Sequence, residues 1–334
     1  IDFGSADANP LYYAKNLFLN GKLVTNLSIP AEVTGIKDYA FYNCNTLKHI
    51  SLGTFVGEDL NGWKGETTVQ ITVADCSFRN CTNLRGFSID HRNKVYRTAA
   101  DGQILVECAY TKGLGDADVF TPTKIVKAGA GIISVGASSY GESGFDSVTV
   151  VDNYAFSNCT LLKEFDFQWV EHIGEHAFEN TALESVALLG DTGKGGYREV
   201  AVGDYAFSNS AFLANVSIGN ISSLGRFVFK NCPALERIDL KEKDRYYTDE
   251  DGVLYEITNN YAILLQYPAG RNDEDDEYLI ETLNVKTRRY DIREIEAYAF
   301  ENSCLQRIVI GQTVDIIGKA AFVDCAQLRT VEIG

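Results

Sequence analysis

The side chains best suited to chemistry in this chain are four histidines and eight cysteines. His172 and His176 have the i, i+4 spacing with which a helix can hold zinc. Ile173 ends an alternating segment and Gly174 follows it, so the two rings are not expected to share a helical face. We interpret them as solvated polar side chains. The chain has no Cys-x2-Cys pair, no Gly-x-Ser-x-Gly motif and no Walker loop. We therefore predict no metal, no cofactor and no catalytic residue.

Two acidic segments could attract calcium. They are "NDEDDE" (272–277) and "TDEDG" (248–252), and neither has the ligand spacing of an EF-hand. Solvated loops are the simpler interpretation of such charge runs, and a calcium site stays the alternative. The glycine-rich "GAGIISVG" (129–136) lacks the spacing of a phosphate-binding fingerprint and is predicted to be a loop.

Most of the cysteines share one place in a repeated pattern. They fall three residues after a phenylalanine, at Cys44, Cys81, Cys159, Cys232 and Cys325. Thr181, Ser210 and Ser303 take this place elsewhere, so the position suits a small, weakly polar group buried at a turn. Disulfides between neighbouring copies remain an alternative, although equivalent side chains of stacked copies would run parallel.

The full pattern is Ile-x3-Ala-Phe-x2-Cys-x2-Leu-x2-Ile-x-Leu, and it recurs along the sequence. Its copies are Ile36–Leu52, Val73–Ile89, Val151–Phe167, Ile173–Leu188, Val202–Ile218, Leu224–Leu240, Ile295–Ile310 and Ile317–Ile333, with a weaker one at Val135–Val150. Uninterrupted copies are 22 residues apart, as between Phe156 and Phe178. A fixed short period predicts a solenoid, because one unit alone cannot bury its apolar face.

Each copy predicts two strands and a turn. The ending "LKHISL" alternates apolar with polar residues, which is typical of a half-buried strand. A preceding "VTGI" or "VEHI" predicts a second short strand. In Ala-Phe-x2-Cys-x2-Leu the apolar residues lie three apart, which favours one turn of α- or 3₁₀-helix. The predicted class is therefore α/β and rich in strands.

The units "IKDYAFYNCNTLKHISL" and "IGEHAFENTALESVAL" resemble the BspA-type leucine-rich repeat, a family of bacterial and protist surface proteins. The resemblance covers about residues 20 to 334. It implies a right-handed leucine-rich-repeat solenoid of about nine 22-residue repeats, with a parallel sheet on its concave side. It also implies adhesion at the cell surface and binding of extracellular matrix proteins.

We expect one repeat domain over residues 1–334, with an N-terminal cap or half repeat at 1–32. Two insertions, 90–131 and 241–289, interrupt the array and resemble each other. Each carries a tyrosine, then an Asp-Gly pair (101–102 and 251–252), then an alternating strand, so each is predicted to form a β-hairpin. Asn20-Gly21 predicts a further turn near the N-terminus.

The outward positions of the repeated strands are the predicted binding site. This concave face carries Ser51, Ser88, Asp166, Ser217, Arg237, Asp239 and Arg307. Such a flat surface suits a protein or glycan better than a buried small ligand. Trp63 and Tyr246 are predicted to be exposed anchors.

The net charge of −16 argues against nucleic acid and against anionic membrane surfaces, and no apolar run reaches the roughly 18 residues of a membrane span. We predict a non-enzymatic surface protein that binds host extracellular proteins or neighbouring cells. It would be extracellular, with any signal or lipid anchor removed. A glycan-binding module is the second hypothesis and predicts clustered, exposed rings at Trp63, Tyr96, Tyr246 and Tyr247. A passive scaffold is also possible. A pocket joining a histidine to a serine or an acid would instead favour an enzyme.

Overall fold

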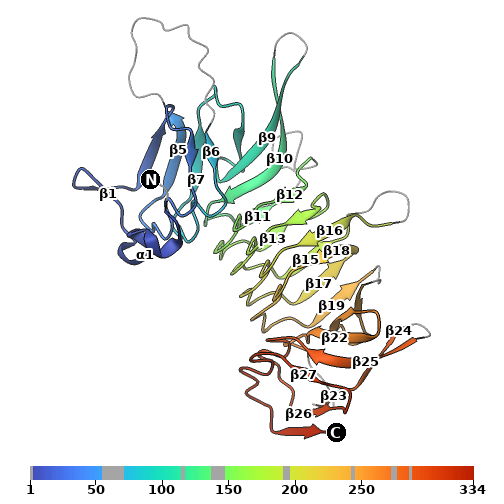
Figure 1. The fold of residues 1–334 in the computed structure, drawn as a ribbon. Helices are drawn as coiled ribbons and strands as arrows, with labels where there is room; N and C mark the ends of the chain where they lie inside the picture. The colour runs from blue at the N-terminus through green and yellow to red at the C-terminus, as the bar shows by residue number, and fades with distance from the viewer. Residues whose placement is uncertain are drawn as a thin grey trace, which may run out of the picture. The chain divides into compact units, whose positions relative to one another are not determined.

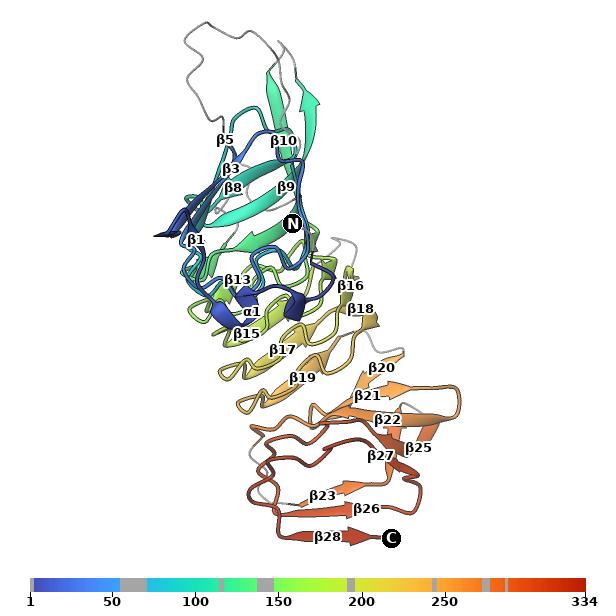
Figure 2. The same ribbon diagram turned by 60° about the vertical axis from the view of Figure 1, so that its left-hand side comes forward.

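The computed structural model describes residues 3–54, 71–113, 117–136, 147–190, 196–241, 245–271, 277–285 and 288–334. The chain divides into two compact units, Ile1–Thr181 and Ala182–Gly334, each considered by itself below. Figures 1 and 2 show the strands of both units.

The first unit begins with the helices that occur in the described part of the chain, η1 (Ala6–Ala8) and α1 (Leu11–Ala14). Strands β1 (Phe18–Leu19) and β2 (Lys22–Leu23) then pair in an antiparallel hairpin. Asn20 and Gly21 between them both have positive φ, as a type I′ turn requires. The turn expected at Asn20-Gly21 is therefore confirmed.

The repeats of the first unit form two lines of parallel strands. The first line contains the strands that end each repeat, which are called the long strands below. They are β3 (Asn26–Pro30), β5 (His49–Thr54) and β7 (Gly86–Ile89) in one sheet, and β11 (Ser134–Val135) and β13 (Glu164–Phe165) in another. The second line contains β4 (Gly35–Ile36), β6 (Thr72–Val73), β12 (Val150–Val151) and β14 (His172–Ile173). Both predicted strands of the repeat are thus present.

The second unit repeats this arrangement. Its long strands are β15 (Ser185–Leu188), β17 (Asn215–Ile218) and β19 (Arg237–Leu240) in one parallel sheet, and β23 (Glu277–Ile280), β26 (Arg307–Ile310) and β28 (Thr330–Ile333) in another. The other line of this unit contains β16 (Glu199–Val202), β18 (Asn220–Leu224) and β27 (Ile316–Ile317). Figure 2 shows β23, β26 and β28 side by side.

Antiparallel strands form most of both predicted insertions, although β23 within 241–289 belongs to a parallel sheet. The first contains β8 (Tyr96–Ala99), β9 (Ile104–Lys112) and β10 (Asp118–Ala128). The second contains β20 (Tyr246–Thr248), β21 (Leu254–Ile257), β22 (Tyr261–Gln266) and β24 (Thr282–Val285), and β24 pairs with β25 (Arg288–Ile295). The strands β8 to β10 of the first insertion and β20 to β22 of the second each pair antiparallel in succession. The last of the three, β10 or β22, then pairs in parallel with β12 or β25 of the next repeat.

Each Asp-Gly turn ends a parallel sheet. Phe87 N on β7 donates to Gly102 O at 2.7 Å, and Ile238 N on β19 donates to Gly252 O at 3.3 Å. Both glycines have φ near +80°, at +83° and +79°, which glycine adopts without steric cost. The insertion therefore occupies the sheet edge that a further repeat strand would otherwise pair with.

The predicted helical turn of the repeat is wrong. Most repeats have two residues with positive φ: one precedes the alanine, as Tyr154 and Tyr205 do, and the other precedes the cysteine position, as Asn158 and Asn231 do. A right-handed helix cannot pass through such residues. Single turn bonds, as from Cys159 N to Phe156 O at 2.9 Å, occur beside bonds to the next repeat, as from Phe156 N to Ala177 O at 2.7 Å. The fold is accordingly rich in strands, with almost no helix.

The phenylalanines that stand three residues before the cysteine position, called the marker phenylalanines here, form the core between the two lines of strands. Phe156 and Phe178 stack at 5.0 Å with their planes 3° apart in the first unit, and Phe207 and Phe229 stack at 5.9 Å in the second. All four rings are fully buried. Stacking of equivalent rings is how each repeat covers the apolar edge of its neighbour.

Candidate functional site

The predicted strand face in the first unit is a row of serines. Parallel pairing places Ser28, Ser51 and Ser88 directly beside one another on β3, β5 and β7. Ser28 and Ser88 are exposed and Ser51 is half-buried. His49 Nε2 lies 2.8 Å from Ser88 Oγ. The structure therefore brings two of the predicted site residues together and adds Ser28 and His49, which the sequence did not single out.

The His49–Ser88 pair meets part of the condition set for an enzyme. A nucleophile and its base also need a third group that orients the base, and a site for the substrate. The other ring nitrogen of His49, Nδ1, faces Gly86: a Cβ built on Gly86 would lie 3.6 Å from it. The pair lies on an open strand face rather than in the cavity described below. It is better described as part of a polar surface.

In the second unit the same face carries a small residue, a hydroxyl and a charge. Parallel pairing aligns Ala187, Ser217 and Asp239 on β15, β17 and β19. Asp239 forms an ion pair with Lys241. Arg237 Nη1 donates to Glu250 O at 2.9 Å, which ties this predicted site residue to the second insertion.

Arg307 and Asp166 are held by neighbouring groups. Arg307 lies between two carboxylates, with Nε 3.2 Å from Glu277 Oε2 and Nη2 2.7 Å from Glu332 Oε1. Asp166 directly follows β13 and accepts a hydrogen bond from Gln168 N at 3.0 Å. Asp166 lies in the first unit and Arg307 in the second, so each is considered with the strand face of its own unit.

The prediction that Tyr246 is an exposed anchor is wrong. Its side chain is buried, and its hydroxyl accepts a hydrogen bond from Leu224 N at 3.3 Å. Tyr96 is buried in the same way, with its hydroxyl 3.1 Å from Val73 N. Each tyrosine pairs with an edge strand of the preceding repeat. Trp63 lies outside the described residues.

The two histidines of the zinc-like spacing do not share a helical face, as expected. His172 is exposed on β14, whereas His176 lies in a turn with φ of +53°. The ring of His176 stacks on Tyr154 at 4.9 Å, and its Nδ1 lies 2.9 Å from Glu179 Oε2. Within the described ranges, no group of three or more metal-binding side chains comes together. The acidic run at 272–276 lies outside those ranges.

Asp249, in the second acidic segment, holds its own turn together. Its carboxylate accepts hydrogen bonds from the backbone of Asp251 and Val253 at 3.0 and 2.9 Å, and from the hydroxyl of Tyr255 at 3.1 Å. Burial raises the pKa of this carboxyl. These contacts give Asp249 a structural role in the Asp-Gly turn.

The repeated cysteines are free thiols inside the turns, as the packing interpretation predicts. Cys81 Sγ donates to Phe41 O at 3.0 Å, and Cys232 Sγ donates to Phe207 O at 3.3 Å, so each thiol bonds to the marker phenylalanine of the preceding copy. Burial raises the pKa of both thiols to about 12. They therefore remain protonated donors.

A ladder of asparagine side chains, which was not predicted from the sequence, runs beside the cysteines. In the first unit Asn158 Nδ2 donates to Asn80 Oδ1 at 3.1 Å, and Asn180 Nδ2 donates to Asn158 Oδ1 at 2.8 Å. Asn231 bonds to Asn209 and Asn302 in the same way in the second unit. The signal was present: asparagine precedes the cysteine position in nearly every copy, and it tolerates positive φ.

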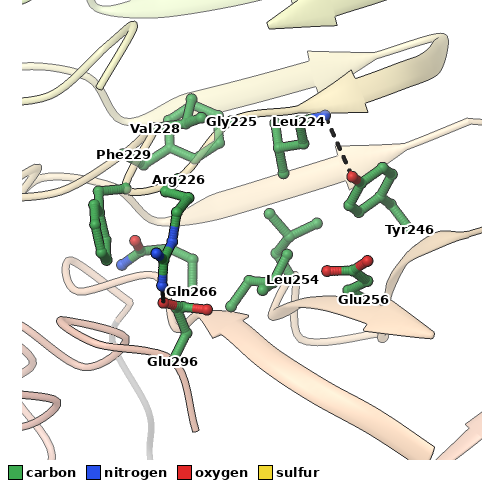
Figure 3. Close-up of a pocket in the computed structure, with 12 residues that line it drawn as sticks. Leu224, Gly225, Arg226, Val228, Phe229, Tyr246, Leu254, Glu256, Gln266 and Glu296 are labelled. Carbon is green, nitrogen blue, oxygen red and sulfur yellow. Dashed lines mark hydrogen bonds and ion pairs between the residues drawn. The ribbon is translucent and has the colours of Figure 1, made fainter. Parts of the chain in front are cut away.

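A cavity of about 150 Å³ opens in the second unit beside the second insertion (Figure 3). Apolar side chains of Leu224, Leu254 and Leu265 line it. Its polar side is formed by Glu256 and by an ion pair in which Arg226 Nη2 lies 3.1 Å from Glu296 Oε1. The cavity is smaller than the 300 Å³ or more typical of drug-sized ligands, so it suits a single side chain.

Comparison with protein families places this architecture among known repeats. Residues 12–96, 143–194, 197–265 and 281–334 match the BspA type leucine rich repeat region, in six copies. The matched segments make up most of the chain, so it belongs to the BspA-type leucine-rich-repeat family. The resemblance found in the sequence is confirmed.

Three crystal structures match the chain at low identity. A leucine rich cell surface protein from Faecalibacterium prausnitzii is 20% identical over 94% of this chain, with a TM-score of 0.48. The pneumococcal vaccine antigen PcpA is 18% identical over 72% of this chain and 70% of its own length, with a TM-score of 0.46. A leucine-rich repeat protein from Eubacterium ventriosum is 14% identical over 100% of this chain and 64% of its own, with a TM-score of 0.37. This chain spans 62% of the F. prausnitzii protein.

No curated protein matches the chain. Among the helices that the structure describes, none is long and apolar enough to cross a membrane.

Proposed function

We propose that this chain is a non-enzymatic cell-surface protein whose strand faces bind host extracellular proteins or neighbouring cells. The observation that carries this proposal is the register of the long strands. It lines up outward side chains such as Ser28, Ser51 and Ser88 in one unit, and Ser217 and Asp239 in the other. Membership of the BspA-type family supports the proposal by analogy, because the resemblance implies surface adhesion.

The same proposal includes the finer features expected from the sequence. The repeats would wind as a right-handed solenoid of about nine units within one domain. The cap would occupy residues 1–32 and the insertions 90–131 and 241–289. The protein would act outside the cell, without a cofactor and without nucleic acid as a partner.

The test is binding of the purified chain to immobilised fibronectin, fibrinogen and collagen at physiological salt. The variant Ser217→Arg places a long cation in the middle of the strand face of the second unit. Ser222→Arg is the matched control, because Ser222 is exposed on β18 in the other line of strands. We expect saturable binding that Ser217→Arg abolishes and Ser222→Arg leaves unchanged. Equal loss in both variants, or no binding to any of the three proteins, would contradict the proposal.

A glycan-binding module is the second candidate function, with binding residues other than those expected from the sequence. The cluster of rings expected at the insertions does not form on the surface, because Tyr96 and Tyr246 are buried. An exposed pair of rings is formed instead by Tyr12 and Tyr13, whose centroids lie 4.9 Å apart near the start of the chain. Glycan-array binding that Tyr13→Ala removes would favour this candidate. A passive scaffold would bind neither the proteins nor the glycans.

A further inference from the structure

The two insertions build equivalent sites, and the first contains a lysine. In the first unit Tyr96 bonds to Val73 N and pairs across the strands with Glu107. Lys124 is the other cross-strand partner of Glu107. Its ammonium lies 3.2 Å from Glu107 Oε2 and 2.8 Å from Asp152 Oδ2. One cation thus forms ion pairs with two carboxylates beside a buried tyrosine.

The second unit has the same frame without the lysine. Tyr246 bonds to Leu224 N and pairs across the strands with Glu256. The other cross-strand partner of Glu256 is Ile263, in the place of Lys124. Glu296 follows the first apolar residue of its repeat, as Asp152 does. Both carboxylates are therefore retained, and the internal cation is missing.

The apolar side chains around the two sites differ in burial at one position. In the first unit Leu105 and Val126 are buried with relative exposures of 0% and 2%. Their counterparts by strand register, Leu254 and Leu265, both line the cavity of Figure 3, and Leu254 is also buried whereas Leu265 is only half-buried. A cavity of about 150 Å³ is large enough for a group the size of benzene. A lysine side chain beyond its Cα has five heavy atoms, one fewer than benzene.

The charges at the cavity favour a cation. A third carboxylate, Glu294, stands where the first unit has Val150. Burial and the neighbouring charge of Glu296 raise the pKa of Glu294. Two guanidiniums approach, Arg226 toward Glu296 and Arg245 toward Glu256. Both are mostly exposed, at 69% and 64%, so they pair with the carboxylates from the solvent side.

We propose that this cavity binds the side chain of a lysine from a partner polypeptide. Its methylenes would lie on Leu254 and Leu265, and its ammonium would lie beside Glu256 and Glu296, as the ammonium of Lys124 lies beside Glu107 and Asp152. The chain supplies its own ligand in the first unit and takes one from another molecule in the second. This site is independent of the strand faces, so either proposal can fail without the other.

The test uses Nα-acetyl-lysine-N-methylamide as the probe and the norleucine analogue as its uncharged match, both titrated by NMR into the whole chain. The lysine probe is expected to bind about tenfold more tightly, the difference that a charge-assisted contact provides. The variant Ile263→Lys should fill the site from within and weaken binding of the probe at least about tenfold. Ile263→Met is the control for length without charge and should leave binding within about twofold.

Guanidinium melts of both variants establish that they fold before binding is measured. Equal affinity for the lysine and norleucine probes would overturn the proposal, because the carboxylates would then play no part. Unchanged binding by Ile263→Lys would overturn it as well, since the probe would lie elsewhere. Absence of binding by the unaltered chain would also overturn it.

Discussion

Replacing Asn158 tests whether the asparagine ladder stabilises the first unit. The side chain of Asn158 has two ladder bonds, to Asn80 at 3.1 Å and from Asn180 at 2.8 Å. Its φ is +64°, a conformation that glycine and asparagine adopt readily and alanine does not. Asn158→Gly therefore removes the side-chain bonds, and Asn158→Ala removes the bonds and strains the backbone.

The two losses can be separated by magnitude. Each half-buried hydrogen bond contributes about 1 kcal/mol, so Asn158→Gly is expected to lower the free energy of unfolding by about 2 kcal/mol. Forcing alanine into the left-handed region adds about 1 kcal/mol. Asn158→Ala should therefore cost about 3 kcal/mol. The control is Asn26→Ala, because Asn26 is exposed on the extended strand β3.

The assay is guanidinium unfolding followed by circular dichroism and tyrosine fluorescence, with coincident curves required before a free energy is extracted. Asn26→Ala should change the free energy of unfolding by less than about 0.5 kcal/mol. The reasoning is refuted if Asn158→Gly is as stable as the unaltered chain, because the ladder would then contribute nothing. Equal stability of the glycine and alanine variants would refute the backbone argument.

Three further predictions concern single groups. Tyr246→Phe removes the acceptor for Leu224 N and should lower the free energy of unfolding by about 1–3 kcal/mol in guanidinium melts. Tyr13→Phe, on the surface, is the control and should leave that free energy unchanged. Equal effects of the two variants would contradict the role of the Tyr246 hydroxyl. Cys304 is the exposed thiol and should react first with a disulfide reagent at pH 8. The buried repeat thiols, such as Cys81 and Cys232, have a raised pKa and should react only after unfolding. Fast reaction of several thiols in the folded chain would contradict this prediction. The hydrogen bond from Arg92 lowers the pKa of Asp90 to about 2, so this pair stabilises the fold above the ordinary carboxyl pKa and loses that effect as the pH falls toward 2. Carboxyl NMR of Arg92→Gln should show the pKa of Asp90 rising toward the ordinary carboxyl value, while the bond from the backbone N–H of residue 92 remains; an unchanged pKa would refute the assignment.

The strands and the core could be read from the sequence because they depend on alternation alone. "LKHISL" and its equivalents bury every second residue, and β17, for example, buries Val216 and Ile218 as that pattern requires. The similar composition of the two insertions also predicted their hairpins, since an Asp-Gly turn has few other uses between alternating segments.

The turns and the anchors could not be read in this way. A spacing of three between apolar residues is shared by a helical turn and by a turn with two left-handed residues, and only the recurring asparagine distinguishes them. The local sequence predicts an exposed ring at Tyr246, because nothing near it in the chain shows that its hydroxyl accepts a hydrogen bond from Leu224 N on another strand. The cavity depends on Ile263 replacing a lysine, which becomes visible only when the two insertions are aligned by strand register.

The most direct test of the proposed function is hydrogen exchange of the chain with and without the matrix protein that it binds. Binding through the strand faces predicts slowed exchange in peptides that contain β17 and β19, or β5 and β7. Turn peptides such as 204–210 should exchange at unchanged rates. Protection confined to the turns, with the long strands unaffected, would contradict the account.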